Sequence, residues 1–333
     1  MALTINTNIS SMVAQQNLNK ATGSLNQAIE RMTTGYKINH AGDNAAGYSI
    51  ARNWETQLGS LDVAADNAAT GADMLMTLED TYALVSTHVQ RIRDLTEQAA
   101  NGTYGKDSKI AIESEIKARL DEINRIAANC EFNGIHLMDG TAGTTNIQVG
   151  LKSDANSKIA LDASLFANST IGGLLAAYSS TTASGGVTLA NILKAANNNT
   201  AITVSAAGIS TDAQKHAVAA ACAGLSYKSS DGTFTEQTTA NCGPEQMLDF
   251  IDKVMASLST KSTTLGAAQN RIDSAIESIA VQSENITSSL STLRDADVAE
   301  ESSKYIQAQI LQQAASTLLA TANQSPSIAL NLI

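Results

Sequence analysis

Apolar residues recur every seven positions between Pro244 and Leu293. The row is unbroken, and its members are Ile251, Leu258, Leu265, Ile272, Ile279, Ile286 and Leu293. Because seven residues make two helical turns, these side chains form one stripe along one side of a helix. A second row, four residues further on, is half polar. The stretch therefore predicts one long helix of a bundle, which needs another long helix, from this chain or a neighbouring copy, to cover its stripe.

Residues 50–100 carry two rows of the same kind and predict the partner of that helix. One row contains Leu61, Ala68, Leu75, Tyr82 and Val89, and the other contains Leu78, Val85, Ile92 and Ala99. We expect Leu61, Leu75, Leu78 and Val85 to meet the stripe of the later helix in an assembly seam. A third helix is predicted at about 107–130, with Ile112, Ile116, Leu120, Ile123 and Ile126 facing inward.

The two ends of the chain are also helical in pattern, and we expect them to pair. Their apolar stripes are narrow and partly made of alanine, so the helices should be ordered mainly by packing. The predicted packing residues are Leu18, Leu25, Met32, Ile310, Leu311 and Leu318. We place the final helix at about 298–322, before Pro326, and expect the apolar tail 328–333 to need a buried place in a partner.

The middle of the chain differs in composition. Residues 146–150 and 157–162 read as two short strands that pair as a hairpin. Residues 163–241 are rich in Ser, Thr, Ala, Asn and Gly, with helices expected at 188–196 and 211–224 and strand pieces near 201–206. This composition predicts a small α+β domain inserted between two halves of a helical bundle.

The fold class that follows is mainly α: an elongated bundle of long coiled-coil-like helices formed by both chain ends, with the hairpin and the outer domain inserted. The expected divisions are a terminal helix (1–44) that pairs with 295–333, the N-terminal part of a core helical domain (45–165), an outer domain (166–243), the C-terminal long helix of the core (244–294) and the second terminal helix (295–333).

Composition narrows the possible partners. The formal net charge is −11 and no long basic patch is present, so a nucleic-acid partner is not expected. No apolar run approaches the roughly 18 residues of a membrane span. The opening residues, MALTINTNISSMVAQQ, lack the charged and apolar regions of a secretory signal peptide.

The cysteines Cys130, Cys222 and Cys242 are too few for a disulfide framework, and pairing of Cys222 with Cys242 stays open.

No catalytic pattern emerges from the sequence. The four histidines, His40, His88, His136 and His216, form no H-E-x-x-H pair, and no phosphate-binding glycine loop is present. Ser and Cys nucleophiles have no recognisable base partner. We therefore expect a non-enzymatic protein without cofactor or metal.

Several long motifs nevertheless occur in a distinctive order. INTNISSMVAQQNL, TTGYKINHAGDNAAGYSIA, FNGIHLMDG and NIQVG lie in the first half, and DADVAEESSKYIQAQILQQAASTLLATANQSPSIALNLI closes the chain. Together they resemble the bacterial flagellins over about 1–165 and 244–333, whereas 166–243 resembles nothing specific.

The resemblance implies a structural subunit of the extracellular flagellar filament, a homopolymer used for swimming, with the paired termini forming its inner tube. It also implies export by the flagellar secretion apparatus without a cleaved signal peptide. The implied partners are a flagellar cap protein, a hook–filament junction protein and an export chaperone. The alternatives are that the chain is itself the hook–filament junction protein, or a filament subunit that displays an enzymatic outer domain.

A further implied partner is the flagellin-sensing Toll-like receptor of animals. The segment QRIRDLTEQ at 90–98 resembles the family's receptor-contact stretch. By position, Arg91, Leu95 and Glu115 match the family's contact residues.

Overall fold

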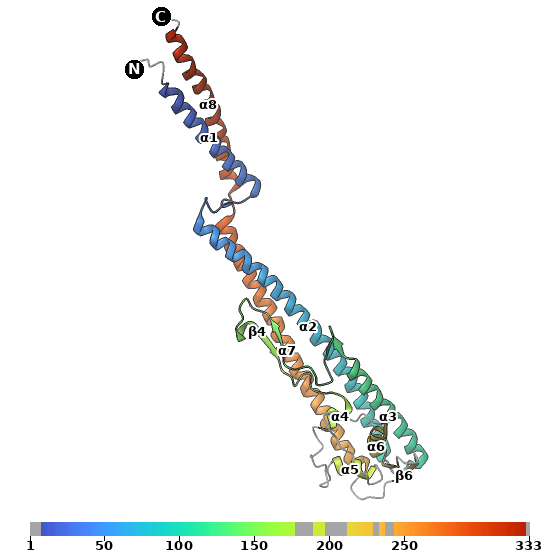
Figure 1. Cartoon of the computed structure of the whole chain (residues 1–333). Helices are drawn as coiled ribbons and strands as arrows, with labels where there is room; N and C mark the ends of the chain where they lie inside the picture. Colours follow the sequence, from blue (N-terminus) through green and yellow to red (C-terminus); the bar gives the residue numbers. More distant parts are fainter. Residues whose placement is uncertain (1–7, 177–188, 197–211, 229–232, 237–242, 331–333) are drawn as a thin grey trace. The chain divides into compact units, whose positions relative to one another are not determined.

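The computed structural model describes residues 8–176, 189–196, 212–228, 233–236 and 243–330 (Figure 1). It is mainly α-helical, as the pattern predicted. The chain divides into two compact units, residues 1–62 with 280–333 and residues 63–279. The long helices α2 (Ala45–Ala100) and α7 (Pro244–Arg294) contribute to both units. These boundaries differ from the divisions expected from sequence, because they cut through the two long helices.

In the first unit, α1 (Ile9–Thr34) and α8 (Val298–Leu330) pack against each other (Figure 1). The buried apolar residues of the seam are alanines at seven-residue spacing: Ala14, Ala21 and Ala28 on α1, and Ala308 and Ala315 on α8. Alanine side chains are short and let the two backbones approach closely. The inner row of α1 is therefore alanine rather than the predicted Leu18, Leu25 and Met32, of which the leucines are half-buried and Met32 is exposed.

Helix α8 extends through Pro326, which corrects the predicted end at about residue 322. A proline inside a helix removes one N–H group, so the carbonyl four residues earlier loses its partner. That carbonyl belongs to Ala322, and the side-chain amide of Asn8 donates a hydrogen bond to it over 2.7 Å. The same side chain caps α1, because Asn8 Oδ1 accepts from the Ser11 backbone N–H at 3.1 Å.

The ends of the helix pairs are tied together by backbone contacts. Gly35 ends α1 with φ of 76°, a left-handed conformation that glycine adopts without strain. Its carbonyl accepts from the Ala296 N–H at 2.8 Å, and the Lys37 N–H donates to the Arg294 carbonyl at 2.7 Å. The Arg294 guanidinium lies 4.0 Å from the centre of the Tyr36 ring and pairs with Glu55. Cation–π, ionic and backbone contacts therefore form a compact joint inside the first unit, where α1 and α8 meet α2 and α7.

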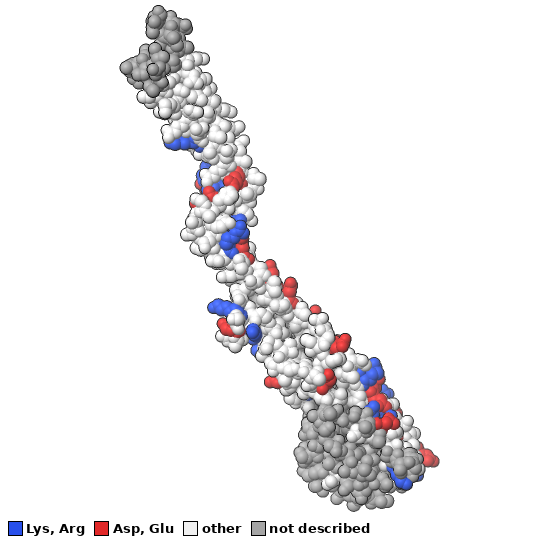
Figure 2. Space-filling view, in the orientation of Figure 1, with Lys and Arg blue, Asp and Glu red and all other residues white. Residues whose placement is uncertain are grey.

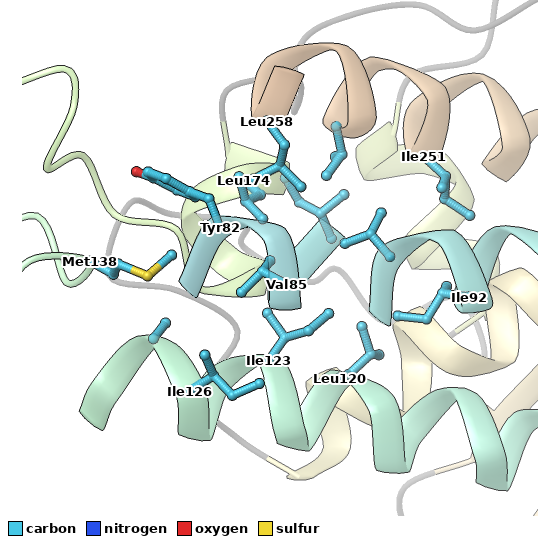
Figure 3. Close-up of a cluster of buried hydrophobic side chains, with 14 of the residues drawn as sticks. Tyr82, Val85, Ile92, Leu120, Ile123, Ile126, Met138, Leu174, Ile251 and Leu258 are labelled. Atoms are coloured by element: carbon cyan, nitrogen blue, oxygen red, sulfur yellow. The ribbon is translucent and has the colours of Figure 1, made fainter. Parts of the chain in front are cut away.

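The second unit has a continuous apolar core between α2, α3 (Lys106–Asn129) and α7 (Figure 3). Figure 3 shows Val85 and Ile92 from α2 interleaved with Leu120 and Ile123 from α3. All five inward residues predicted for α3 are buried. Polar contacts also join α2 to α7: Arg93 to Asp252 at 2.6 Å, and Gln269 to Glu79 at 2.7 Å.

Two short hairpins follow α3. Strands β1 (Glu131–Phe132) and β2 (Ile135–His136) are joined by Asn133 and Gly134, whose φ angles of 49° and 79° suit a two-residue hairpin turn. Strands β3 (Thr145–Gln148) and β4 (Lys158–Leu161) pair antiparallel, as predicted. Ile147 faces Ile159 across this hairpin, and both are buried in the core.

The described part of the predicted outer domain shares the same core. Helices α5 (Leu189–Ala196) and α6 (Asp212–Ala223) confirm the two predicted helices, and α4 (Ile171–Ala176) precedes them. Residues 217–223 of α6 are buried and mostly alanine, which lets α6 pack closely on α3. A hairpin of β5 (Leu225–Lys228) and β6 (Thr233–Glu236) was not predicted, and the predicted strand pieces near 201–206 lie outside the described residues.

Replacing Asn8 with Ala is expected to fray both terminal helices, because it removes the cap of α1 and the donor to Ala322. Loss of such a cap costs about 0.5–2 kcal/mol. Amide hydrogen exchange should become faster at Ser11 and in the last turns of α8. Asn8→Ser, which keeps a capping oxygen, should restore protection at Ser11 only. Identical exchange in Asn8→Ala and the parent chain would contradict the dual role of Asn8.

Candidate assembly interface

The predicted seam residues lie mostly inside the single chain. Leu61, Leu75, Leu78 and Val85 of α2 are buried, as are Ile251, Leu258, Leu265, Ile272 and Ile279 of α7. Only the last two members of the α7 row, Ile286 and Leu293, are half-exposed. The stripe is therefore covered from within the chain over most of its length, and Ile286 and Leu293 keep surface for a neighbouring copy.

The terminal helix pair shows the opposite arrangement. Ile310, Leu311 and Leu318 are 60%, 53% and 63% exposed, so they do not pack between α1 and α8 in the single chain. Further large apolar side chains exposed on this pair are Ile9, Met12, Val13, Ile29, Val298 and Ile306. Because alanine fills the seam, the larger apolar residues point outward. If Ile310, Leu311 and Leu318 pack as predicted, they do so against a neighbouring copy of the chain.

This terminal surface is also free of formal side-chain charge. Residues 1–19 and 305–333 contain no Lys, Arg, Asp or Glu. Figure 2 shows the described part of this end as an uninterrupted uncharged surface. Monomeric proteins rarely expose large contiguous apolar patches, and such patches mark interaction sites. We name the exposed apolar residues of α1 and α8 the terminal face.

Charged groups of the first unit gather instead where α1 and α8 reach the joint. Arg31 pairs with the buried Glu301 at 3.4 Å, and Lys304 pairs with Glu301 at 2.9 Å. They line a cavity of about 300 Å³. The Asp43 carboxylate accepts the backbone N–H groups of His40 and Asn39, and these bonds lower its pKa. The cluster binds the connector to the helix pair.

Of the three candidate receptor-contact residues, Arg91 and Glu115 lie at the surface and Leu95 lies in the core. Arg91 Nε lies 2.9 Å from Glu115 Oε1, and both side chains are partly exposed. This pairing raises the pKa of Arg91, first through the hydrogen bond that its guanidinium donates to the Glu115 carboxylate. Leu95 is only 2% exposed and belongs to the core. In this conformation, Arg91 and Glu115 are open to a partner, whereas Leu95 supports α2 from inside.

His216 forms a contact between two helices. His216 Nδ1 lies 2.8 Å from Glu113 Oε1, so the pair links α6 to α3. The His216 ring stacks on Tyr227 at 4.6 Å between centroids. Burial raises the pKa of Glu113. Within the part of the chain that the structure describes, no group of three or more His, Cys, Asp or Glu side chains could hold a metal ion.

Sequence reasoning missed a half-buried cation in the second unit, Lys261. Lys261 Nζ donates to the Ala167 carbonyl at 3.1 Å and to Ser169 Oγ at 2.9 Å, and it lies 5.5 Å from the centre of the Tyr82 ring. Tyr82 in turn donates to the Leu165 carbonyl at 2.7 Å. Burial lowers the pKa of Lys261 to about 8 and raises that of Tyr82 to about 12.

A sequence signal for Lys261 was available. The residue lies three positions after Leu258 and four before Leu265, on the side of α7 that carries the apolar stripe. The alanine rows of α1 and α8 were also missed as the inner seam, although their seven-residue spacing is visible. Cys222 is a free, buried thiol, and Cys242 lies outside the described residues.

An α-helical chain that buries one set of heptad stripes and exposes another at its ends is a subunit built for self-assembly. Comparison with known proteins gives the family. The model for the bacterial flagellin N-terminal helical region matches residues 5–143, and the model for the C-terminal helical region matches residues 248–333. The chain belongs to the bacterial flagellin family, whose members are structural subunits of the flagellar filament.

Curated relatives match along the whole chain. Polar flagellin F of Vibrio parahaemolyticus is 30% identical, and polar flagellin A of the same species is 32% identical; each alignment covers 100% of both chains. Flagellin C of Vibrio anguillarum is 30% identical with the same coverage. A crystal structure of Bacillus cereus flagellin matches 64% of this chain and 88% of its own at 19% identity, with a TM-score of 0.38, too low to establish a common arrangement. No helix among the described residues is long and apolar enough to span a membrane.

The half-buried lysine predicts a pH dependence of monomer stability. The native state loses the Lys261 proton near pH 8, whereas the unfolded chain keeps it up to about pH 10.4. Between these values the unfolded chain binds more protons, so the free energy of unfolding should rise with pH. The gain should end above pH 10, where Tyr82 acts in the opposite direction. Urea unfolding of Lys261→Met should lose this rise, and an unchanged slope would contradict the burial of the charged amine.

Proposed function

We propose that this chain is the subunit that polymerises into the extracellular flagellar filament, and that copies associate through the terminal face. One observation supports the proposal most strongly: the large apolar residues of α1 and α8 point away from the α1–α8 seam, and those within residues 1–19 and 305–333 lie in segments without a charged side chain. Family membership supplies the context, since the whole chain aligns with flagellins.

The energetics favour association over isolation of this pair. Burying one Leu, Ile or Met side chain stabilises by roughly 1.5–3 kcal/mol. Helices held by a narrow alanine seam gain little from their own contact, and isolated helices depend on tertiary packing. Neighbouring copies that cover Ile306, Ile310 and Leu318 would remove this apolar area from water. The absence of Lys, Arg, Asp and Glu then avoids the cost of burying unpaired charge.

Replacing Ile310 with Asp tests the terminal face. Ile310 is exposed in the single chain, so the variant should keep the helicity of the monomer, whereas a charge buried between copies should abolish seeded polymerisation. Light scattering and electron microscopy would measure filament growth. The control is Ser303→Asp, which adds the same charge beside Glu300 and Lys304 and should still polymerise. Normal filaments from Ile310→Asp would contradict the proposal.

We infer the remaining partners from the family. An export chaperone would cover the C-terminal segment before secretion, a cap protein would guide addition at the filament tip, and a hook–filament junction protein would form the base. The secretion route would be the flagellar apparatus, without a cleaved signal peptide. The alternative identity as the junction protein is less favoured, because full-length matches are to flagellins. The alternative of an enzymatic outer domain would require activity that is lost when 166–243 is deleted.

A second candidate function is recognition by the flagellin-sensing Toll-like receptor. Its support is the exposed Arg91–Glu115 pair at the position of the family's contact residues. Arg91→Ala is expected to reduce receptor signalling by monomeric protein at least about tenfold, because the loss of one charged contact at an interface weakens binding by about this factor. Arg125→Ala, an exposed arginine of α3 that pairs with Glu122, should signal normally. Equal signalling by both variants would remove Arg91 from the candidates.

A further inference from the structure

Lys261 is a half-buried cation of α7. Its two hydrogen bonds go to neutral oxygens, of Ala167 and Ser169, although an ammonium group has three donors. The third neighbour is the face of the Tyr82 ring. Among the described residues, none supplies a carboxylate that pairs with Lys261. Desolvation of this charge is therefore only partly compensated within one chain.

An open groove lies directly beside this amine. Its volume is about 480 Å³, and Lys261 is one of its lining residues. One wall is the loop after β4, with Ser164, Leu165 and Ala167, and the other wall is the face of α7 that carries Thr260 and Thr264. Among the described residues that line the groove, Lys261 is the only one with a charged side chain. The groove therefore offers one cation among hydroxyl and small apolar groups, a setting that suits a single carboxylate.

The same unit carries a row of acidic residues on α2. Asp66, Asp73 and Asp80 are spaced seven residues apart, so they share one side of the helix, and all three are exposed. No Lys or Arg occurs between residues 53 and 90. Figure 2 shows acidic side chains spaced along the edge that α2 forms in that view. We name these three residues the α2 acidic row.

We propose that the groove at Lys261 receives a carboxylate from the α2 acidic row of a second copy of this chain. The inference rests on the proposed function, because it requires a homopolymer. Among the described residues, a cation without an acidic partner and acids without a basic partner belong to the same compact unit, and contact between copies would satisfy both. The groove and the row are different surfaces, so the contact is heterologous and repeats along an open helical assembly.

Removing one partner of a desolvated pair weakens association more than removing an exposed charge. Lys261→Met should therefore raise the critical concentration for seeded polymerisation by about tenfold or more. Asp66→Asn, Asp73→Asn and Asp80→Asn, tested singly, should include one variant with a similar rise. Combining that variant with Lys261→Met should add no further increase. Asp273→Asn, which removes an exposed acid of α7 rather than of the α2 acidic row, is the matched control and should behave as the parent chain.

A purely local role for Lys261, as a tie between α7 and the loop at 167–169, makes a different prediction. Lys261→Met would then change the urea midpoint of the monomer and leave the critical concentration unchanged, which would overturn the proposal. Additive effects of Lys261→Met with all three Asn variants would also overturn it. Should Lys261→Met fail to fold, a cryo-EM map of parent filaments decides: a carboxylate within about 4 Å of Nζ supports the contact, and an unfilled groove overturns it.

The parent chain separates this inference from the function on which it rests. Failure of the parent protein to form filaments under seeding would count against the proposed function. Filaments of the parent and of Lys261→Met with equal critical concentrations would leave the filament role intact and refute the Lys261 contact alone.

Discussion

The close approach of α1 and α8 across alanine is the constraint on which the first unit depends. Short side chains at Ala14, Ala21 and Ala28 let two helices meet without using their larger apolar residues. Those residues are consequently left on the outside, and residues 1–19 and 305–333 contain no charged side chain. The contact between α1 and α8 thus uses only small side chains, and the larger apolar side chains remain available for contacts with other copies. A subunit that polymerises through this pair needs such an exposed apolar surface.

In the second unit, by contrast, the large apolar residues are buried within the single chain. Its heptad rows on α2 and α7 meet large side chains from α3 and from the segment after β4, and they become fully buried. Folding of this unit is therefore complete within one chain, apart from isolated features such as Lys261. A subunit with one self-sufficient core and one incomplete helix pair can remain folded before assembly and still gain stability when neighbours surround its ends.

Sequence periodicity predicted most of the helices because apolar spacing reports which side of a helix is buried. It predicted Leu18, Leu25 and Met32 as packing residues and alanine as part of the stripe, whereas in the single chain the alanines are buried and the two leucines are half-buried. It also ended α8 too early, because a proline normally ends a helix and the compensating bond from Asn8 comes from the other end of the chain. Both differences depend on contacts between segments that lie far apart in the sequence: the packing of α1 against α8, and the hydrogen bond from Asn8 to Ala322.

The sequence by itself determined the long helices, the α3 core face, the β3–β4 hairpin and the motifs that indicate the family, because these depend on local spacing and turn chemistry. Only the tertiary structure decided which apolar rows are used inside the chain and which remain for neighbours. It also showed that Leu95 is buried while Arg91 is exposed, and that no carboxylate among the described residues pairs with Lys261. The physical reason is that periodicity identifies one side of a helix, whereas burial depends on what packs against it.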